Sequence, residues 1–318
     1  MSAGPQTEIL LKAGTNELEI IEFGAAGKAY GVNVAKVKKV LHYTPELLTR
    51  VHGTPRGVEG VIYYQGKPIL LINLREFLRL EGLPIPEHRQ LAIVTQFNDV
   101  TAAFLVDAVN RIHRVSWKAL TPLETVVPGG SAPCVTGTIT IENRVLMVLD
   151  LEHLMSEIAP ETGIKATIAA SANVAVNPLR SSLRIVYAED SAMIRRMTTD
   201  QLRKAGFTQI EVFENGQLAL NGIRELIGKA ETQGKPAEAA FDLLLTDIEM
   251  PQLDGLSLCR TLREELQVRA VPVVIYSSLI NEQMAVKCRS VGSNAHISKP
   301  KIEEIVETLD RLGKVAVG

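Results

Sequence analysis

The chain has 318 residues, of which 46% are apolar, and its formal net charge at pH 7 is −2. At roughly 100–200 residues per domain this length predicts two domains, and the apolar content is sufficient for two cores. The near-neutral charge provides no basic surface for nucleic acid, which we therefore do not expect as a partner.

The sequence carries no signal for export, membrane insertion or cysteine chemistry. Residues 1–6 are small and polar, without the apolar segment of a signal peptide. No apolar stretch reaches the roughly 18 residues of a membrane helix. Cys134, Cys259 and Cys288 are widely spaced and odd in number, which fits reduced thiols. We therefore expect a cytoplasmic protein that does not insert into the membrane directly.

Two β-hairpins are the clearest predicted elements of the first half. One spans residues 61–72 around a polar turn at 65–67, and the other spans 138–149 around a polar turn at 142–144. Short alternating or apolar runs separated by polar turns indicate an all-β domain.

The two hairpins align with each other without a gap, and each is followed by a short apolar helix. A similar strand precedes each of them, at residues 29–33 and 103–107. The alternative is chance agreement, since the shared residues are mostly pattern rather than identity. A duplication predicts a pair of small β-barrels, because closure removes exposed sheet edges. Residues 1–158 contain no catalytic motif, so this half is expected to bind rather than to catalyse.

Residues 7–156 resemble the CheW-type coupling domain, which consists of two SH3-like β subdomains. The resemblance implies that residues 7–158 link methyl-accepting chemoreceptors to a CheA-type histidine kinase. Gln65 stands where this family commonly has Arg; because a rim charge mainly changes association rate, we expect coupling to be retained with altered partner preference. The residues that carry the resemblance are Tyr30 to Val34, Gly60 to Ile62, Ile69 to Leu74, Leu105 to Val109 and Leu149 to Leu151.

Residues 159–182 are predicted to be a flexible linker. The stretch 166–176 is rich in Ala, Ser, Thr and Asn and carries no charge, and Pro160 and Pro178 stand on either side of it. The other interpretation is that part of this stretch extends a helix of the first domain.

Residues 183–315 alternate strand-like and helix-like patterns. This βαβ rhythm predicts an α/β doubly wound domain with a five-stranded parallel sheet of flavodoxin-like order. The expected strands are 183–188, 210–213, 241–246, 271–276 and 295–298, and the expected helices are 191–204, 216–229 and 303–312, with a polar loop insertion at 231–240.

Reactive side chains follow four of these strands, and parallel strands present their carboxyl ends at one edge of the sheet. They are Glu189, Asp190, Asp247, Ser277 and Lys299. Three crowded carboxylates favour a cation, and Mg²⁺ accepts carboxylate and phosphate oxygens. The lysine supplies positive charge for a phosphoryl oxygen, and a carboxylate can attack phosphorus. The residues thus predict a Mg²⁺-assisted phosphoryl acceptor with Asp247 as the nucleophile.

Residues 183–312 resemble the two-component receiver domain. The motifs that carry this resemblance are Glu189-Asp190, Asp247, Met250-Pro251, Asp254-Gly255, Pro272 through Ser277, and Lys299-Pro300.

The receiver resemblance assigns roles to individual residues. It implies that Asp190 and Asp247 bind Mg²⁺ directly or through water, that Glu189 helps to hold it, that the backbone carbonyl of Glu249 is a further ligand, and that Asp247 is the phosphoacceptor. Ser277 takes the place of the switch hydroxyl, with its neighbour Ser278 as the alternative, and Lys299 that of the invariant lysine. His296 stands at the switch position where the family often has Tyr or Phe; the alternative for His296 is a packing residue.

A coupling domain followed by a receiver is the arrangement of the CheV branch, which residues 14–23 also resemble. We therefore expect a phosphorylation-regulated chemotaxis adaptor rather than an enzyme, associated through its partners with receptor arrays at the inner face of the membrane. One alternative is a receiver that serves mainly as a phosphate sink for the kinase, and another is a response regulator with a DNA-binding or enzymatic output. A third alternative is an aspartyl-phosphate phosphatase, which would require Asp at the position of Glu249.

Overall fold

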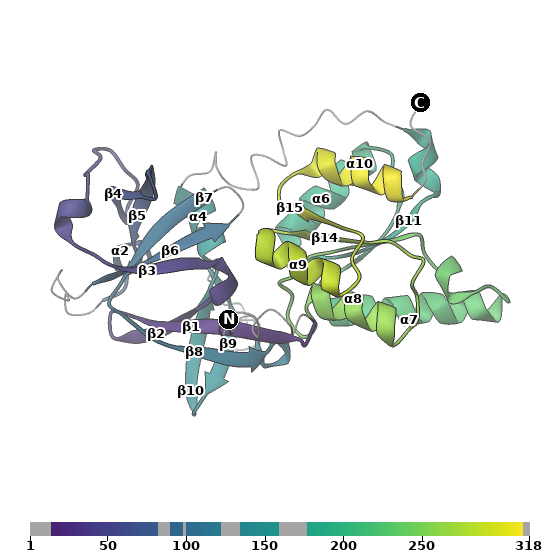
Figure 1. The fold of residues 1–318 in the computed structure, drawn as a ribbon, viewed down its shortest axis with the longest axis horizontal. Coiled ribbons are helices and arrows are strands. Elements are labelled where there is room, and N and C mark those ends of the chain that lie inside the picture. The colour runs from purple at the N-terminus through teal and green to yellow at the C-terminus, as the bar shows by residue number, and fades with distance from the viewer. Residues whose placement is uncertain (1–13, 82–89, 98–99, 122–133, 159–176, 314–318) are drawn as a thin grey trace, which may run out of the picture. The chain divides into compact units, whose positions relative to one another are not determined.

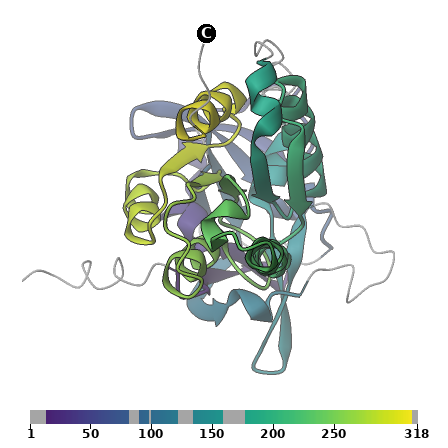
Figure 2. The same cartoon turned by 90° about the vertical axis from the view of Figure 1, so that its right-hand side faces the viewer.

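The fold was analysed in a computed structural model that describes residues 14–81, 90–97, 100–121, 134–158 and 177–313 (Figure 1, Figure 2). The chain divides into two compact units, which we treat separately. The first consists mainly of β1 (Glu17–Ala25) through α4 (Leu151–Ile158), and the second of η6 (Pro178–Ser182) through α10 (Ile302–Leu312). Within the described residues, no helix is both long enough and apolar enough to span a membrane.

The first unit contains two five-stranded sheets, with orders β8-β1-β2-β10-β9 and β3-β6-β7-β5-β4. Short helices, among them α2 (Leu74–Phe77) and α4, follow the two hairpins. The strands beyond β1 are β2 (Lys28–Asn33), β3 (Val37–His42), β4 (Val58–Tyr64), β5 (Lys67–Asn73), β6 (Leu91–Phe97), β7 (Val100–Val106), β8 (Ala108–Ser116), β9 (Val135–Ile141) and β10 (Arg144–Leu149).

Both predicted hairpins are confirmed, as β4–β5 and β9–β10, but their turns are one residue shorter than predicted. Gln65 and Gly66 have φ of 48° and 80°, and Glu142 and Asn143 have φ of 48° and 61°. Two consecutive positive φ values are typical of the two-residue turn whose twist matches that of the flanking strands. The third residue of each predicted turn is therefore the first residue of the second strand: Lys67 pairs with Tyr64, and Arg144 pairs with Ile141.

The duplicated pattern does not correspond to one sheet per copy. β5 from the first copy pairs in parallel with β7 from the second, and β10 from the second copy pairs in parallel with β2 from the first. Each hairpin thus completes the sheet that the other copy begins. The equivalence of the copies is visible in the capping residues, because Asn73 accepts backbone N–H groups at the start of α2 and Asp150 does so at the start of α4.

The second unit is a parallel sheet of order β12-β11-β13-β14-β15, as predicted. Its strands are β11 (Arg184–Ala188), β12 (Gln209–Phe213), β13 (Leu243–Thr246), β14 (Val273–Ser277) and β15 (Ala295–Ser298). Its helices are α6 (Ala192–Lys204), α7 (Gly216–Thr232), α8 (Gly255–Glu264), α9 (Glu282–Ser290) and α10, and the predicted loop insertion contains the short helix η7 (Ala237–Ala239).

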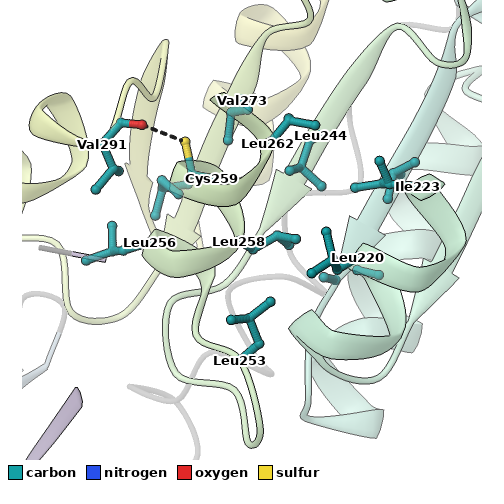
Figure 3. Packing of buried hydrophobic residues seen from close by; sticks show 14 of the residues in the cluster. Leu220, Ile223, Leu244, Leu253, Leu256, Leu258, Cys259, Leu262, Val273 and Val291 are labelled. Carbon is teal, nitrogen blue, oxygen red and sulfur yellow. Dashed lines mark hydrogen bonds between the residues drawn. The ribbon is translucent and has the colours of Figure 1, made fainter. Parts of the chain in front are cut away.

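Helices cover both faces of this sheet, which is why its central strands β13 and β14 are buried at every residue. Side chains of α6 and α10 pack on one face, and those of α7, α8 and α9 pack on the other (Figure 1). Figure 3 shows the second of these cores, where Leu220 from α7 and Leu258 from α8 pack near Leu244 of β13. The two cores hold the strands in register and so fix where the strand ends lie.

The last six residues of the predicted linker, 177–182, pack on the second unit, whereas residues 159–176 lie outside the described residues. Arg180 lies in η6 and is buried. It donates two hydrogen bonds to the carboxylate of Asp310 in α10, at 2.8 and 2.7 Å, and a third to the carbonyl of Ala205 at 2.7 Å. Its guanidinium also lies 5.4 Å from the centre of the Phe207 ring.

We expect Arg180→Met to destabilise the second unit by about 3–5 kcal/mol, because it leaves the buried carboxylate of Asp310 without its charged partner. The measurement is chemical denaturation of the full chain, with hydrogen exchange to assign the loss to the second unit. The control is Arg196→Met, because the Arg196–Asp200 pair has side chains that are 85% and 52% exposed and should contribute less than about 0.5 kcal/mol. Equal losses in both variants would contradict the expectation.

Candidate functional site

The predicted site residues converge at the carboxyl edge of the second unit's sheet. Glu189 and Asp190 directly follow β11, Asp247 follows β13, Ser277 ends β14, and Lys299 follows β15. β11, β13 and β14 are neighbours in the sheet, so the first three of these strand ends lie side by side. One ligand oxygen from each of Glu189, Asp190 and Asp247 lies within 4.8 Å of the other two.

Lys299 bridges two of the carboxylates. Its Nζ lies 2.7 Å from Oε2 of Glu189 and donates a hydrogen bond of 2.8 Å to Oδ2 of Asp247, and its side chain is almost completely buried. Burial disfavours the ammonium, but the charges of Asp247 and Glu189 outweigh this, so the pKa of Lys299 is raised well above its usual value. The ammonium is therefore a fixed positive charge beside Asp247.

Glu189 is the carboxylate that needs a cation most. It is fully buried, and burial raises its pKa to about 8, although Lys299 acts in the opposite direction and the charges of Asp247 and Asp190 add to the increase. Its second oxygen, Oε1, has no hydrogen-bond partner among the described residues. A buried carboxylate oxygen without a partner, beside two further carboxylates, is a donor set that fits Mg²⁺.

Asp247 is held rigidly by its surroundings. It is 5% exposed, and its Oδ1 accepts the backbone N–H of Ile248 at 2.6 Å. A side chain at Gly255 would bring its Cβ to 1.8 Å from the carbonyl oxygen of Asp247, so the start of α8 approaches Asp247 closely only because this residue is glycine. Asp254 caps α8 by accepting the N–H of Ser257. The Asp-Gly pair of the sequence thus shapes the loop that follows Asp247.

The remaining predicted residues lie around this centre. Ser277 and Ser278 are both buried, and Oγ of Ser277 accepts the N–H of Leu279 at 3.4 Å. Glu249 is half-buried in the loop after Asp247. His296 pairs with Ile275 in the ladder between β14 and β15, outside the carboxylate cluster, and burial lowers its pKa.

Two residues that the sequence reasoning missed also contact the site. Tyr187 in β11 donates its hydroxyl to Oε2 of Glu189 at 3.3 Å. Arg195 in α6 donates from Nη1 to the backbone carbonyls of Glu189 and Asp190, at 2.7 and 2.9 Å. A tyrosine inside an otherwise aliphatic buried strand, two residues before an acidic residue, is the signal that could have identified the first of them.

Comparisons with known proteins match two separate parts of the chain. Residues 19–159 match the CheW-like domain, and residues 185–310 match the response regulator receiver domain. The chain is 26% identical to chemotaxis protein CheV3 of Helicobacter pylori over 93% of this chain and 95% of that protein. It is 25% identical to chemotaxis protein CheW of Klebsiella aerogenes, over 48% of this chain and 91% of that protein.

A similarity to solved structures was also found. The receiver domain of the histidine kinase CKI1 from Arabidopsis thaliana, complexed with Mg²⁺ and BeF₃⁻, is 23% identical with a TM-score of 0.36 and covers 42% of this chain and 94% of that one.

Proposed function

The chain is a CheV-type protein, a CheW-like domain followed by a receiver domain, and from this premise we propose that it is a chemotaxis adaptor regulated by phosphorylation of Asp247. The observation that carries the proposal is the presence, in one chain, of a coupling domain and of a receiver whose acceptor, acidic cluster and lysine are brought together at one sheet edge. A DNA-binding or enzymatic output is less well supported, because the family match of the first half is to a CheW-like domain.

The proposed chemistry is transfer of a phosphoryl group from a phosphohistidine of a CheA-type kinase. A carboxylate oxygen of Asp247 forms the new bond to phosphorus while the bond between phosphorus and the histidine nitrogen breaks, and the electron pair stays with the imidazole. Lys299, already in contact with Asp247, offsets the added negative charge, and the hydroxyl of Ser277 donates to a phosphoryl oxygen. Positioning and charge are most of what phosphoryl transfer asks of a protein.

Mg²⁺ would be held by Glu189, Asp190 and Asp247, with the backbone carbonyl of Glu249 as a further ligand. When bound, it neutralises charge on the phosphoryl oxygens. The protein's own contribution is to hold the acidic side chains in a buried pocket beside a fixed ammonium, so that they are costly to leave without a cation.

The coupling half is proposed to link chemoreceptors to the kinase, which would place the protein in the cytoplasm at receptor arrays through its partners. An acyl phosphate on Asp247 passes a signal only if the two states of the receiver differ in their contacts with the coupling domain or its partners. We propose Ser277 and His296 as the residues whose surroundings change between those states. The protein is thus an adaptor whose only reaction is its own phosphorylation and dephosphorylation.

The test is ATP turnover by a reconstituted receptor–kinase complex at saturating ATP, with a separate receiver protein in excess as the phosphoryl acceptor and with wild type or Asp247→Asn as the adaptor. Phosphorylation-regulated coupling predicts turnover that changes with time as wild type becomes phosphorylated and stays constant with the variant. A receiver that acts mainly as a phosphate sink predicts the same constant turnover with both, because it removes phosphoryl groups without altering coupling. Turnover that is unaffected by either adaptor would contradict the proposed function.

A further inference from the structure

We infer that Tyr187 is a positioning residue that orients Glu189 for the divalent cation. This inference rests on the proposed function, since it concerns the same acceptor site. Tyr187 contacts neither the acceptor nor the phosphoryl group, and it acts through Glu189 alone.

Two donors converge on one oxygen of Glu189. The hydroxyl of Tyr187 and the ammonium of Lys299 both lie within hydrogen-bond distance of Oε2, at 3.3 and 2.7 Å. Oε1 has no partner among the described residues and is fully buried. The two donors therefore select which oxygen stays available, and they leave Oε1 free to interact with the cation, directly or through a water molecule.

Packing alone does not explain why the buried position of Tyr187 carries a hydroxyl group. The side chain is completely buried in the core between the sheet and helices α6 and α10, which also contains Phe207 and Tyr276. A phenolic hydroxyl in such a core is costly unless it is hydrogen-bonded, and phenylalanine would fill the same space without that cost. The hydrogen bond to Glu189, together with an interaction with the hydroxyl of Thr198, offsets the burial of this hydroxyl.

A second tyrosine provides an internal comparison. Tyr276 in β14 belongs to the same core and is equally buried, with its ring 5.7 Å from Nζ of Lys299. Its hydroxyl interacts with the hydroxyl of Thr198, as that of Tyr187 does, but it makes no hydrogen bond to Glu189. Replacing either tyrosine by phenylalanine removes one buried hydroxyl from the same core, but only at Tyr187 does it free the Glu189 carboxylate.

A freed carboxylate should bind the cation less well. Glutamate has one more rotatable bond than aspartate, and a side chain that must be ordered on binding loses rotamer entropy at that moment. With the Tyr187 hydroxyl gone, Lys299 alone restrains the carboxylate, and either oxygen can turn toward the ammonium. Part of the binding free energy is then used to order Glu189.

The experiment measures Mn²⁺ binding to the full chain at fixed pH, by the electron paramagnetic resonance signal of the free ion, with Mg²⁺ calorimetry as a second readout. We expect Tyr187→Phe to raise the Kd about fivefold, which is the order of one hydrogen bond. Tyr276→Phe is the matched control and should stay within about twofold of wild type. Thermal unfolding without metal checks that both variants are folded.

A double-mutant cycle with Glu189→Gln separates positioning from packing. If Tyr187 acts through Glu189, the Tyr187→Phe effect disappears when Glu189 is already replaced. A wild-type Kd for Tyr187→Phe, an equal loss in Tyr276→Phe, or an effect that persists in the Glu189→Gln background would each overturn the inference. Failure of the wild type to bind Mn²⁺ or Mg²⁺ at all would instead overturn the metal site of the proposed function, and the inference with it.

Discussion

Asp247→Asn is expected to abolish labelling of the full chain by a small acyl-phosphate donor such as acetyl phosphate. The amide that replaces the carboxylate is neutral and is not a nucleophile toward phosphorus, so the new bond cannot form. The ammonium of Lys299 also loses one of its two charged partners, the one at 2.8 Å, and keeps Glu189. Intact mass spectrometry should show one added phosphoryl group on wild type with Mg²⁺, none after chelation, and none on the variant under any condition.

The matched control for this loss is Asp242→Asn. Asp242 precedes β13 as Asp247 follows it, and its carboxylate accepts hydrogen bonds from the side chain and backbone of Arg184. This pair is partly exposed, so its loss should change stability modestly and leave labelling intact. Labelling that persists in Asp247→Asn would show that another carboxylate is the acceptor. Absence of labelling in wild type would mean either that phosphorylation requires the kinase or that this receiver is inactive.

The convergence of acidic residues and a lysine at one sheet edge was predictable because its signal is local. An apolar run of strand length that ends in Asp247, followed by Pro251 and Gly255, needs no knowledge of the rest of the chain. Convergence of the strand ends then follows from parallel topology, because successive βαβ units place every carboxyl end at one edge. The same reasoning could not say which oxygen of Glu189 is occupied, since that depends on side-chain directions within the core.

The parts that escaped prediction depend on contacts between residues far apart in sequence. Arg180 reads as an ordinary basic residue of a polar linker, and only the packing of η6 against α10 reveals its pairing with Asp310, 130 residues later. The sheets of the first unit are a second example. The alternation in β4–β5 is the same whether the hairpin pairs with β2 of its own copy or with β7 of the other, so local pattern cannot decide the pairing.

Lys299→Met is expected to lower the stability of the second unit and to prevent phosphorylation, and added Mg²⁺ should restore the stability but not the phosphorylation. The substitution replaces the ammonium by an apolar side chain of similar length and leaves the buried carboxylates of Glu189 and Asp247 facing each other. In a chelator at pH 8 the second unit should lose about 3–5 kcal/mol of unfolding free energy. The control Lys301→Met removes an exposed lysine paired with Glu304 and should change it by less than about 0.5 kcal/mol.

The loss should depend on pH with a definite sign. The folded-state pKa of Glu189 is raised to about 8 from 4.5, mainly by burial. A group whose pKa is raised on folding contributes stability that is fully present below its unfolded-state pKa. That contribution is lost as pH rises through its folded-state pKa. Lys299 opposes that increase in pKa, so its removal should cost least at low pH, where Glu189 is protonated in both proteins, and progressively more as pH rises through about 8, in denaturation experiments without metal.

Added Mg²⁺ should restore most of the stability of Lys299→Met, because a divalent ion among the carboxylates supplies the missing positive charge. It should not restore phosphorylation, because the cation does not replace the ammonium that already contacts Asp247 and stands ready to offset the transferred charge. Recovery of both properties would mean that Lys299 serves only to neutralise the pocket. Recovery of stability alone assigns the lysine to the transfer step, where its burial and its two short contacts place it.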